Sequence, residues 1–351
     1  TSSSDMTGIP FLTLGIGEQG SNEVPDILGL PSTNLHTDFK LSSLGETLYL
    51  FAPSGQITDS IAFPALPQDV SYGRENEQGE TWVMFKDPSP GEANSGEIYT
   101  GNVQDSVSFS HQTGFYNNSF LLTLSGADTI YYTLDATEPD KTSEFYEGPI
   151  LINKNSFVKA RILKNADFSR IYTVNYLFNA NHALPVISLN TEDDYLWDND
   201  IGMYVFGDDY ESNFPYFGAN FWEDWEYPFY LHFFDQNKNE VLSTGCGAKI
   251  FGGWTRGLNQ KSLSLFARSK YGDSSFDYRF FRSRPYAEFE SVILRNGGND
   301  WDWGFVRDAV MTSLLEGMEV DYQAFQPVVC YLNNDYWGIY NMREKISEHF
   351  I

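Results

Sequence analysis

The segment from Lys249 to Gly272 concentrates the residue types that can hold an anion. It reads KIFGGWTRGLNQKSLSLFARSKYG, with the glycine pair Gly252 and Gly253 followed by Arg256 and Lys261 between two apolar runs. Glycines let backbone N–H groups approach a negatively charged group closely, and the two cations supply positive charge in a strongly acidic chain. The segment therefore predicts a site for a phosphate-bearing ligand, although glycine beside basic residues is also typical of a solvated hairpin.

Two further blocks follow this segment in the chain. They read FESVILRNGGNDWDWGFVRDAV at 289–310 and PVVCYLNNDYWGIYNMREKI at 327–346. Together, the three blocks resemble the CotH family of atypical, protein-kinase-like proteins over about the last half of the chain. The residues that fall on the family pattern are Lys261, Ser262, Leu294, Arg295, Asp300, Arg307, Asp308, Asn333, Tyr336, Gly338, Tyr340 and Glu344.

The resemblance implies ATP-dependent phosphoryl transfer to protein hydroxyls, with ATP and magnesium as cofactors and a protein as substrate or partner. Such reactions need cationic contacts to the nucleotide oxygens, carboxylates that hold the metal, and a positioned acceptor. Lys261 is the first candidate for a phosphate contact and Arg256 is the second. Gly252 and Gly253 are the candidates for a close backbone approach to the nucleotide.

Glu344 is the candidate partner of Lys261, by analogy with the glutamate that orients the nucleotide lysine in protein kinases. A solvated pairing of Glu344 with Arg343 or Lys345 explains it equally well. In the family, the metal-binding and catalytic aspartates lie in a later segment, whereas this chain ends at Ile351. We therefore expect a fragment that does not transfer phosphate alone and binds nucleotide weakly, and we assign no catalytic residue.

Several charged residues of the second block flank apolar runs, namely Arg295, Asp300, Arg307 and Asp308. We expect them to be partly buried and paired with one another, as structural support before ligand contact. In the third block, Asn333, Tyr336 and Gly338 predict a turn, and turn chemistry alone explains them.

Two upstream segments resemble modules of large exported bacterial proteins. Residues 35–94 resemble the second half of a bacterial lamin-tail domain, and residues 107–178 are similar to the chitobiase C-terminal-like, fibronectin-III-associated sandwich. The lamin-tail marks are Gly45, Glu46, Gly55, Asp59, the run 71–74, Trp82, Pro88, Ser89, Pro90 and Gly91. The predicted domains are a partial lamin-tail-like β-sandwich at 1–97, a second β-sandwich at 98–180, and the N-terminal portion of a CotH kinase-like domain at 181–351.

The composition agrees with a multi-domain chain that is rich in β-structure. Aromatic residues make up 17% of the chain, and short Tyr, Phe, Thr and Val runs are broken by turn residues, a pattern typical of strands. In the second module we expect strands at 120–124, 129–134, 158–163 and 171–178. Residues 181–351 are expected to be α+β, with one helix from about Trp303 to Glu316. Tyr230, His232 and Phe234 are expected to share one strand face.

Charge and composition exclude several classes of protein. A net charge of −26 and a pI near 4.3 argue against a nucleic-acid partner, because phosphate neutralisation needs a basic face. No segment approaches the roughly twenty apolar residues of a transmembrane helix. Cys246 and Cys330 are predicted to be buried thiols, and the scattered histidines have no metal-ligand spacing. From the module types we expect a secreted or cell-surface protein. The start has neither a basic n-region nor an initiator Met, and the front half of the lamin-tail pattern does not occur, so we expect a fragment of a longer precursor.

The alternative function is an extracellular adhesive or scaffold protein that binds carbohydrate through its sandwich modules and carries a non-catalytic CotH-like domain. The candidate stacking residues are Tyr131, Tyr132, Phe145 and Tyr146. Alternating aromatics are, however, more typical of a core. The acidic residues Asp135, Glu138 and Asp140 predict a turn capped by its own aspartates, with calcium as the alternative. A degenerate kinase-like domain used for protein contacts is a third possibility.

Overall fold

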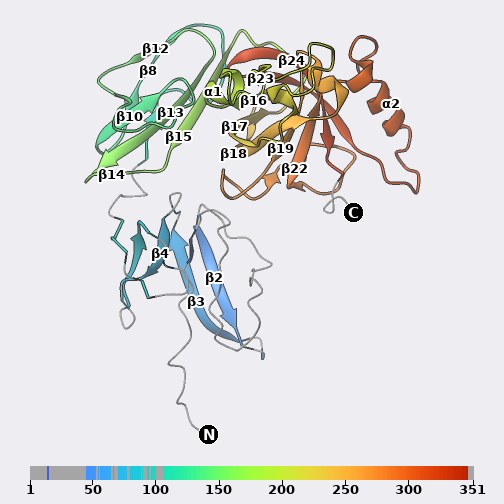
Figure 1. The fold of residues 1–351 in the computed structure, drawn as a ribbon. Coiled ribbons are helices and arrows are strands. Elements are labelled where there is room, and N and C mark those ends of the chain that lie inside the picture. Colours follow the sequence, from blue (N-terminus) through green and yellow to red (C-terminus); the bar gives the residue numbers. More distant parts are fainter. Residues whose placement is uncertain are drawn as a thin grey trace. The chain divides into compact units, whose positions relative to one another are not determined.

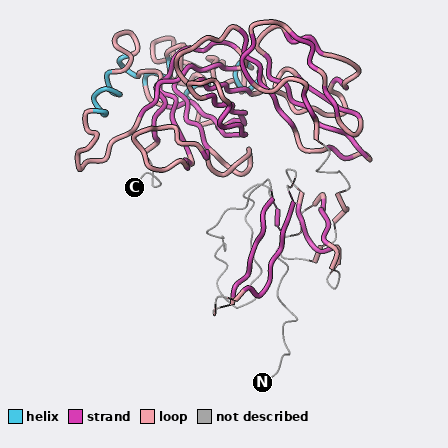
Figure 2. Tube along the Cα trace, turned by 180° about the vertical axis from the view of Figure 1, so that it is seen from behind, coloured by secondary structure: helices cyan, strands magenta, loops and turns pink. Residues whose placement is uncertain are grey.

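The computed structural model describes residues 14–15, residues 45–99 with short gaps (53, 55, 65, 67–69, 77–79, 88, 90–92 and 95), and residues 106–346. The chain divides into two compact units. One comprises 1–106 with the short pieces 127–129 and 162–170, and the other comprises 107–126, 130–161 and 171–351. Strands dominate both units, and the helices are few and short (Figure 1; Figure 2). This confirms the predicted β-rich, multi-domain fold class.

The first unit contains two small antiparallel sheets. β2 (Gly45–Phe51) pairs with β3 (Ile57–Pro64), and β4 (Ser71–Arg74) lies between β1 (Leu14–Gly15) and β5 (Trp82–Phe85). Phe63 and Leu66 are buried, with partly buried apolar side chains packed against them. The lamin-tail resemblance of this unit stays a prediction. Of its marks, Gly55, Pro88, Pro90 and Gly91 lie outside the described residues.

The second module has the strands that the sequence predicts. Its main sheet has the order β11 (Glu144–Phe145), β10 (Thr129–Thr133), β13 (Ser156–Lys164), β15 (Tyr172–Phe178) and β7 (Gly114–Tyr116), with β14 (Asp167–Phe168) on β13. Two smaller pairs are β8 (Phe120–Leu122) with β12 (Ile150–Ile152), and β6 (Ser108–Phe109) with β9 (Leu124–Ser125). The strands predicted at 129–134, 158–163 and 171–178 are confirmed as β10, β13 and β15. The strand predicted at 120–124 is divided into β8 and β9, which pair with different strands.

The acidic turn of this module is capped by its own aspartates. The Asp135 carboxylate accepts the backbone N–H of Thr137 at 3.1 Å, and the Asp140 carboxylate accepts the N–H of Thr142 at 2.7 Å. These bonds confirm the turn prediction. Among the described residues, no group of three or more His, Cys, Asp or Glu side chains is placed to hold a metal ion.

The third module is a closed barrel. Its strands follow the order β16 (Val186–Asn190), β17 (Tyr227–Phe234), β18 (Glu240–Phe251), β19 (Ser262–Phe266), β22 (Ser291–Arg295), β24 (Asp335–Glu344) and β23 (Phe325–Leu332). Closure is made by the parallel pairing of β16 with β23, in which Val186 lies opposite Val329. Alternate residues, such as Ile187 and Leu189, point into a continuous buried core. Cys246 and Cys330 are free and buried within it, as predicted.

Short helices, helical turns and one small strand pair lie in the connections between the barrel strands. They are α1 (Asp194–Trp197), η1 (Asn220–Trp222), η2 (Trp254–Gly257), η3 (Gly298–Asp300), α2 (Arg307–Ser313), and the small strand pair β20 (Phe276–Asp277) and β21 (Glu288–Phe289). The predicted helix is present as α2 but is shorter than expected at both ends. Residues 314–316 form turns rather than helix, and Gly317 has a φ of +83°, which ends the helical path as glycine commonly does.

The second module packs against one face of the barrel. Leu177 and Ala180 form a buried cluster with Val186, Phe234 and Val329. The ring of Phe157 lies 5.6 Å from Tyr230 and 5.8 Å from His232. This contact confirms that Tyr230, His232 and Phe234 share a strand face.

Candidate functional site

The loop that joins β18 to β19 carries the basic residues singled out in the sequence. Gly252 begins the loop with a φ of +104°, a conformation that L side chains rarely adopt. Gly253 follows, and a Cβ added there would meet nothing within 4 Å. The chain then makes the single turn of η2, in which the Arg256 N–H donates to the Gly253 carbonyl at 2.9 Å. Lys261 directly precedes β19.

Lys261 is buried, with only 4% of its surface exposed. Its ammonium group donates hydrogen bonds to the carbonyl oxygens of Arg256 at 2.7 Å and Leu258 at 3.0 Å. It also lies 3.8 Å from the centroid of the Phe221 ring and 5.8 Å from that of Tyr204. Burial lowers the pKa of Lys261 to about 8, because removal from water disfavours the charged form.

Arg256 is half-buried and bound to the backbone of neighbouring segments. Its Nε donates to the Gly252 carbonyl at 2.7 Å, and its Nη1 donates to the carbonyls of Phe221 at 3.3 Å and Trp222 at 3.1 Å. Its guanidinium carbon lies 5.5 Å from the Trp222 ring centroid. Burial lowers the pKa of Arg256. The guanidinium thus joins the η2 loop to the η1 turn.

Glu344 does not pair with Lys261, nor with Arg343 or Lys345. Its carboxylate accepts hydrogen bonds from Arg284 Nε at 2.8 and 2.9 Å and from Arg284 Nη2 at 2.7 Å. The expected pairing of Glu344 is therefore corrected, because an arginine fork matches both carboxylate oxygens where a single ammonium group does not.

Two more groups complete the Glu344 site. The Tyr286 hydroxyl and the Ala324 backbone N–H also donate to its carboxylate, at 2.5 and 2.7 Å. Burial, followed by the hydrogen bond to Glu344, raises the pKa of Tyr286 to about 12. Arg284 and Tyr286 were not predicted as site residues. They lie on either side of Pro285 in a basic and aromatic run, and this run is the sequence signal that could have located them.

One family residue is tied directly to Lys261. The Tyr340 hydroxyl donates to the Lys261 backbone carbonyl at 2.9 Å. Nearby, Gln260 Nε2 donates to the Ile339 carbonyl at 2.8 Å, and Gly338 has a φ of +111° with Gln260 packed against it. The structure thus brings together Lys261, Arg256 and Tyr340.

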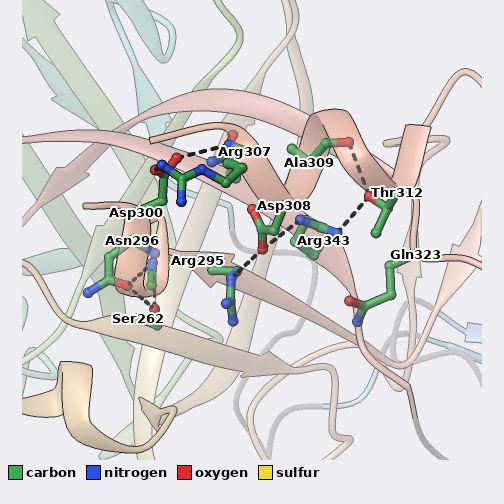
Figure 3. A network of polar contacts seen from close by, with 12 residues as sticks. Ser262, Arg295, Asn296, Asp300, Arg307, Asp308, Ala309, Thr312, Gln323 and Arg343 are labelled. Atoms are coloured by element: carbon green, nitrogen blue, oxygen red, sulfur yellow. Dashed lines mark hydrogen bonds and ion pairs between the residues drawn. The ribbon is translucent and has the colours of Figure 1, made fainter. Parts of the chain in front are cut away.

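The four charged residues of the second block form ion pairs on the outside of the barrel (Figure 3). Asp308 on α2 binds Arg295 at 2.7 Å and Arg343 at 3.1 Å. Asp300 pairs with Arg307 at 3.0 Å. The backbone hydrogen bond from Arg307, followed by that from Gly304 and the charge of Arg307, lowers the pKa of Asp300, and burial opposes this only in part. The prediction of structural pairing is confirmed.

Ser262, the first residue of β19, is hydrogen-bonded to Asn296, which follows β22, beside this network (Figure 3). The Ser262 hydroxyl donates to the Asn296 side-chain oxygen at 2.9 Å, and the Asn296 backbone N–H donates to the Ser262 hydroxyl at 3.0 Å. Both residues are buried. The family serine thus has a structural hydrogen-bond role in this arrangement.

A pocket of 380 Å³ opens at a different place. It is lined by residues 282–283, 313, 316 and 322–327, at the end of α2 and the start of β23. Glu344 borders this region through its bond to Ala324. Lys261 and Arg256 do not line it, so this pocket and the basic loop are separate features.

The basic loop, as arranged, does not fit a nucleotide phosphate. Lys261 and Arg256 both donate to backbone carbonyls, so a phosphate oxygen has to displace those acceptors to bind either cation. Gly253 is the exception, since the space beside its Cα is open. A phosphate therefore requires the loop to move.

The fold defines a β-rich module followed in the chain by a closed β-barrel, and both parts match known families. Residues 248–351 match the family described as CotH kinase protein, and residues 120–176 match the family described as Fn3 associated. The chain therefore contains a CotH portion and an Fn3-associated module, as the sequence motifs indicate. No curated protein matches the chain. Among the described residues, no helix has the length and apolar character needed to cross a membrane.

Proposed function

We propose that the CotH portion binds the phosphate groups of ATP with magnesium at the loop from Gly252 to Lys261, and serves phosphoryl transfer to protein hydroxyls. The burial and the contacts of Lys261 are the observation that supports this proposal. Lys261 combines the family position with a buried ammonium group that has carbonyl and aromatic neighbours rather than a carboxylate partner. A buried lysine with a lowered pKa is typical of functional sites.

Binding requires the η2 loop to release Lys261. Gly252 and Gly253 stand where the loop leaves β18, and their conformational freedom suits them to act as a hinge. In an open loop, Lys261 would be free to donate to phosphate oxygens, which are stronger acceptors than carbonyl oxygens. Arg256, on the same loop, would supply the second cationic contact.

We further propose that nucleotide binding by this chain alone is weak and that it does not turn ATP over. In protein kinases the nucleotide lysine must be paired with a glutamate before phosphoryl transfer occurs. Here Glu344 is engaged by Arg284 and Tyr286, and Lys261 by its own loop. The arrangement described therefore supports a closed, inactive state.

The test compares the wild-type chain with Lys261→Met in thermal unfolding and calorimetric titration with ATP and magnesium. Lys270→Met is the control, because Lys270 is exposed and its ammonium group lies 3.6 Å from the Glu226 carboxylate in a long ion pair. We expect ATP with magnesium to raise the melting temperature of wild type and Lys270→Met but not of Lys261→Met. An equal shift in all three, or none in any, contradicts the proposal. Radiolabelled ATP with a protein acceptor measures turnover in the same samples.

The Fn3-associated module supports a secreted or cell-surface location for the natural protein, since modules of this kind are typical of extracellular proteins. Immunodetection in the medium and on intact cells of the producing organism tests this proposal. Detection only after cell lysis contradicts it.

A further inference from the structure

A cluster of exposed aromatic rings lies beside the basic loop. We call it the aromatic platform, and its members are Phe206, Tyr210, Phe214, Phe217 and Trp254. Each side chain is at least 40% exposed, and Trp254 is 62% exposed. Large aromatic side chains gathered on a protein surface are typical of an interaction site.

The rings of the platform form one connected surface. Trp254 lies 6.2 Å from both Phe214 and Phe217. Phe206 lies 4.8 Å from Tyr210, and the half-buried Tyr216 bridges Phe206 at 5.1 Å and Phe214 at 5.9 Å. The platform therefore joins the segment between α1 and η1 to the turn of η2.

The backbone beneath the platform is closely packed. A Cβ added to Gly257 would lie 2.8 Å from the Phe214 ring, and one added to Gly218 would lie 2.4 Å from the Asp209 carbonyl. The Glu211 N–H donates to the Phe217 carbonyl at 2.8 Å, and Trp222 Nε1 donates to the Pro215 carbonyl at 2.9 Å. The rings are thus held in place before a ligand arrives, which lowers the entropic cost of binding.

The charges around the platform favour a cationic ligand. No lysine or arginine occurs from Ile171 to Asn237, whereas Asp and Glu recur throughout this segment. Asp209 and Glu211 are exposed beside the rings, and neither has a cationic partner in the part of the chain that the structure describes.

The cations of β18 and of the η2 turn are already engaged. Lys249 binds Asp224 at 2.7 Å, and Arg256 donates to backbone carbonyls. Ammonium and guanidinium groups are attracted to the faces of Trp, Tyr and Phe rings, and more so beside carboxylates.

We propose that the aromatic platform docks a segment rich in lysine or arginine from a protein partner. The cationic side chains stack on Trp254 and the neighbouring phenylalanine rings, and Asp209 and Glu211 pair with them at the rim. Trp254 lies on the same η2 loop as Lys261. The docking uses the exposed rings with the loop closed as described and not the buried ammonium of Lys261, so the inference goes beyond the proposed function and does not depend on it.

The test measures the binding of a fluorescent octapeptide of alternating arginine and lysine by anisotropy, at low and moderate salt. Trp254→Ala is the main variant, because it removes the central ring without changing the net charge. We expect at least a tenfold loss of affinity for Trp254→Ala and a severalfold loss for Phe217→Ala. Trp303→Ala removes a tryptophan that is 80% exposed elsewhere, and we expect it to bind within twofold of wild type.

Charge variants separate the platform from general attraction to an acidic chain. Asp209→Asn with Glu211→Gln should weaken binding and reduce its dependence on salt. Asp302→Asn with Asp321→Asn removes the same charge from exposed positions elsewhere and should have the smaller effect. Wild-type affinity in Trp254→Ala, or equal losses in the two charge variants, overturns the proposal. Binding of neutral oligosaccharides that depends on Trp254, without peptide binding, also overturns it.

Discussion

At the scale of single residues, Lys261 and Glu344 are both buried and ionisable, but their hydrogen-bond partners differ in kind. Glu344 is satisfied by a charged partner, Arg284, and by two further donors. Lys261 is satisfied by carbonyls and rings alone, and its pKa is lowered to about 8. A buried charge without an opposite charge costs stability, so Lys261 is held at an energetic cost.

The pH dependence of stability should reveal this cost. Below pH 8 Lys261 is protonated in both the folded and the unfolded state. Between pH 8 and the ordinary pKa of 10.5 the folded state has released the proton that the unfolded state still holds. The free energy of unfolding therefore gains up to about 3 kcal/mol from this residue as pH rises through that window.

Urea unfolding of wild type and Lys261→Met from pH 7 to 10 measures this gain as the difference between the two proteins. We expect the stability of wild type to rise relative to the variant over this range. Parallel curves for the two proteins would show that Lys261 is not buried as described.

Glu344 is predicted to contribute more than an exposed ion pair does. Glu344→Gln removes the charge that faces Arg284, whose side chain is only 14% exposed, and should cost about 3 kcal/mol in the free energy of unfolding. Asp224→Asn is the matched control, since Asp224 is 79% exposed in its pair with Lys249. Its cost should stay below about 1 kcal/mol. Similar costs for the two variants in urea unfolding contradict this account of Glu344.

At the scale of elements, α2 is held to the barrel by the polar residues Asp308 and Thr312, with Ala309 buried between them. Asp308 binds Arg295 and Arg343 on the barrel strands, and Thr312 accepts a hydrogen bond from Arg343 at 3.0 Å (Figure 3). Val310 and Leu314, which stand at helical spacing in the sequence, remain exposed, at 47% and 63%. The spacing correctly predicted a helix, but the charged face is the one that the barrel binds.

The anchoring role of Asp308 is testable. Asp308→Ala leaves Arg343, which is 2% exposed, without its carboxylate, and should cost about 2 kcal/mol. Hydrogen exchange in residues 307–313 should speed up more than exchange in the barrel strands. Asp302→Ala, at an exposed position outside the network, should change neither. Unchanged exchange in α2 of Asp308→Ala contradicts the anchoring role.

Turns were more predictable than the partners of side chains. Asn333 and Asn334 join β23 to β24 with φ values of 45° and 71°, which asparagine tolerates better than most residues. The turn prediction is therefore confirmed at Asn333, whereas Tyr336 and Gly338, which were predicted to belong to the same turn, lie in β24. By contrast, Glu344 and Arg284 are far apart in sequence, and no local pattern links them.

At the scale of the molecule, the barrel and the Fn3-associated module share buried surface. Phe157 of the module is fully buried between its own sheet and Tyr230 of β17. Asn155 donates to the Asn334 carbonyl at 2.7 Å, and Asn175 donates to the Asn334 side chain at 3.2 Å. These contacts place the two modules in one compact unit.

We therefore predict that the two modules unfold together. Phe157→Ala should cost about 3–5 kcal/mol and should speed hydrogen exchange in β17 as well as in β13. Phe145→Ala is the control, because Phe145 is 52% exposed on the same module and its loss should cost little. Faster exchange confined to the Fn3-associated module contradicts a shared folding unit.

The closure of the barrel and the packing of the Fn3-associated module against it could not be predicted from the sequence. Alternation of apolar and polar residues predicts strands, but the pairing of Val186 with Val329 joins distant parts of the chain. The family motifs located Lys261 and Arg256 and predicted cationic contacts to phosphate. The motifs did not predict that backbone carbonyl oxygens and the Phe221 ring bind these cations in the closed loop.

The central claim, that Lys261 is the phosphate contact of a nucleotide site, is tested most directly by labelling with an acyl-phosphate derivative of ATP. The amine of a lysine beside the phosphates attacks the acyl carbon, an amide forms, and ATP leaves. Mass spectrometry of the digested chain then locates the label. We predict labelling at Lys261 that excess ATP with magnesium suppresses. Labelling spread over exposed lysines such as Lys270, with Lys261 unmodified and no protection by ATP, would contradict the account.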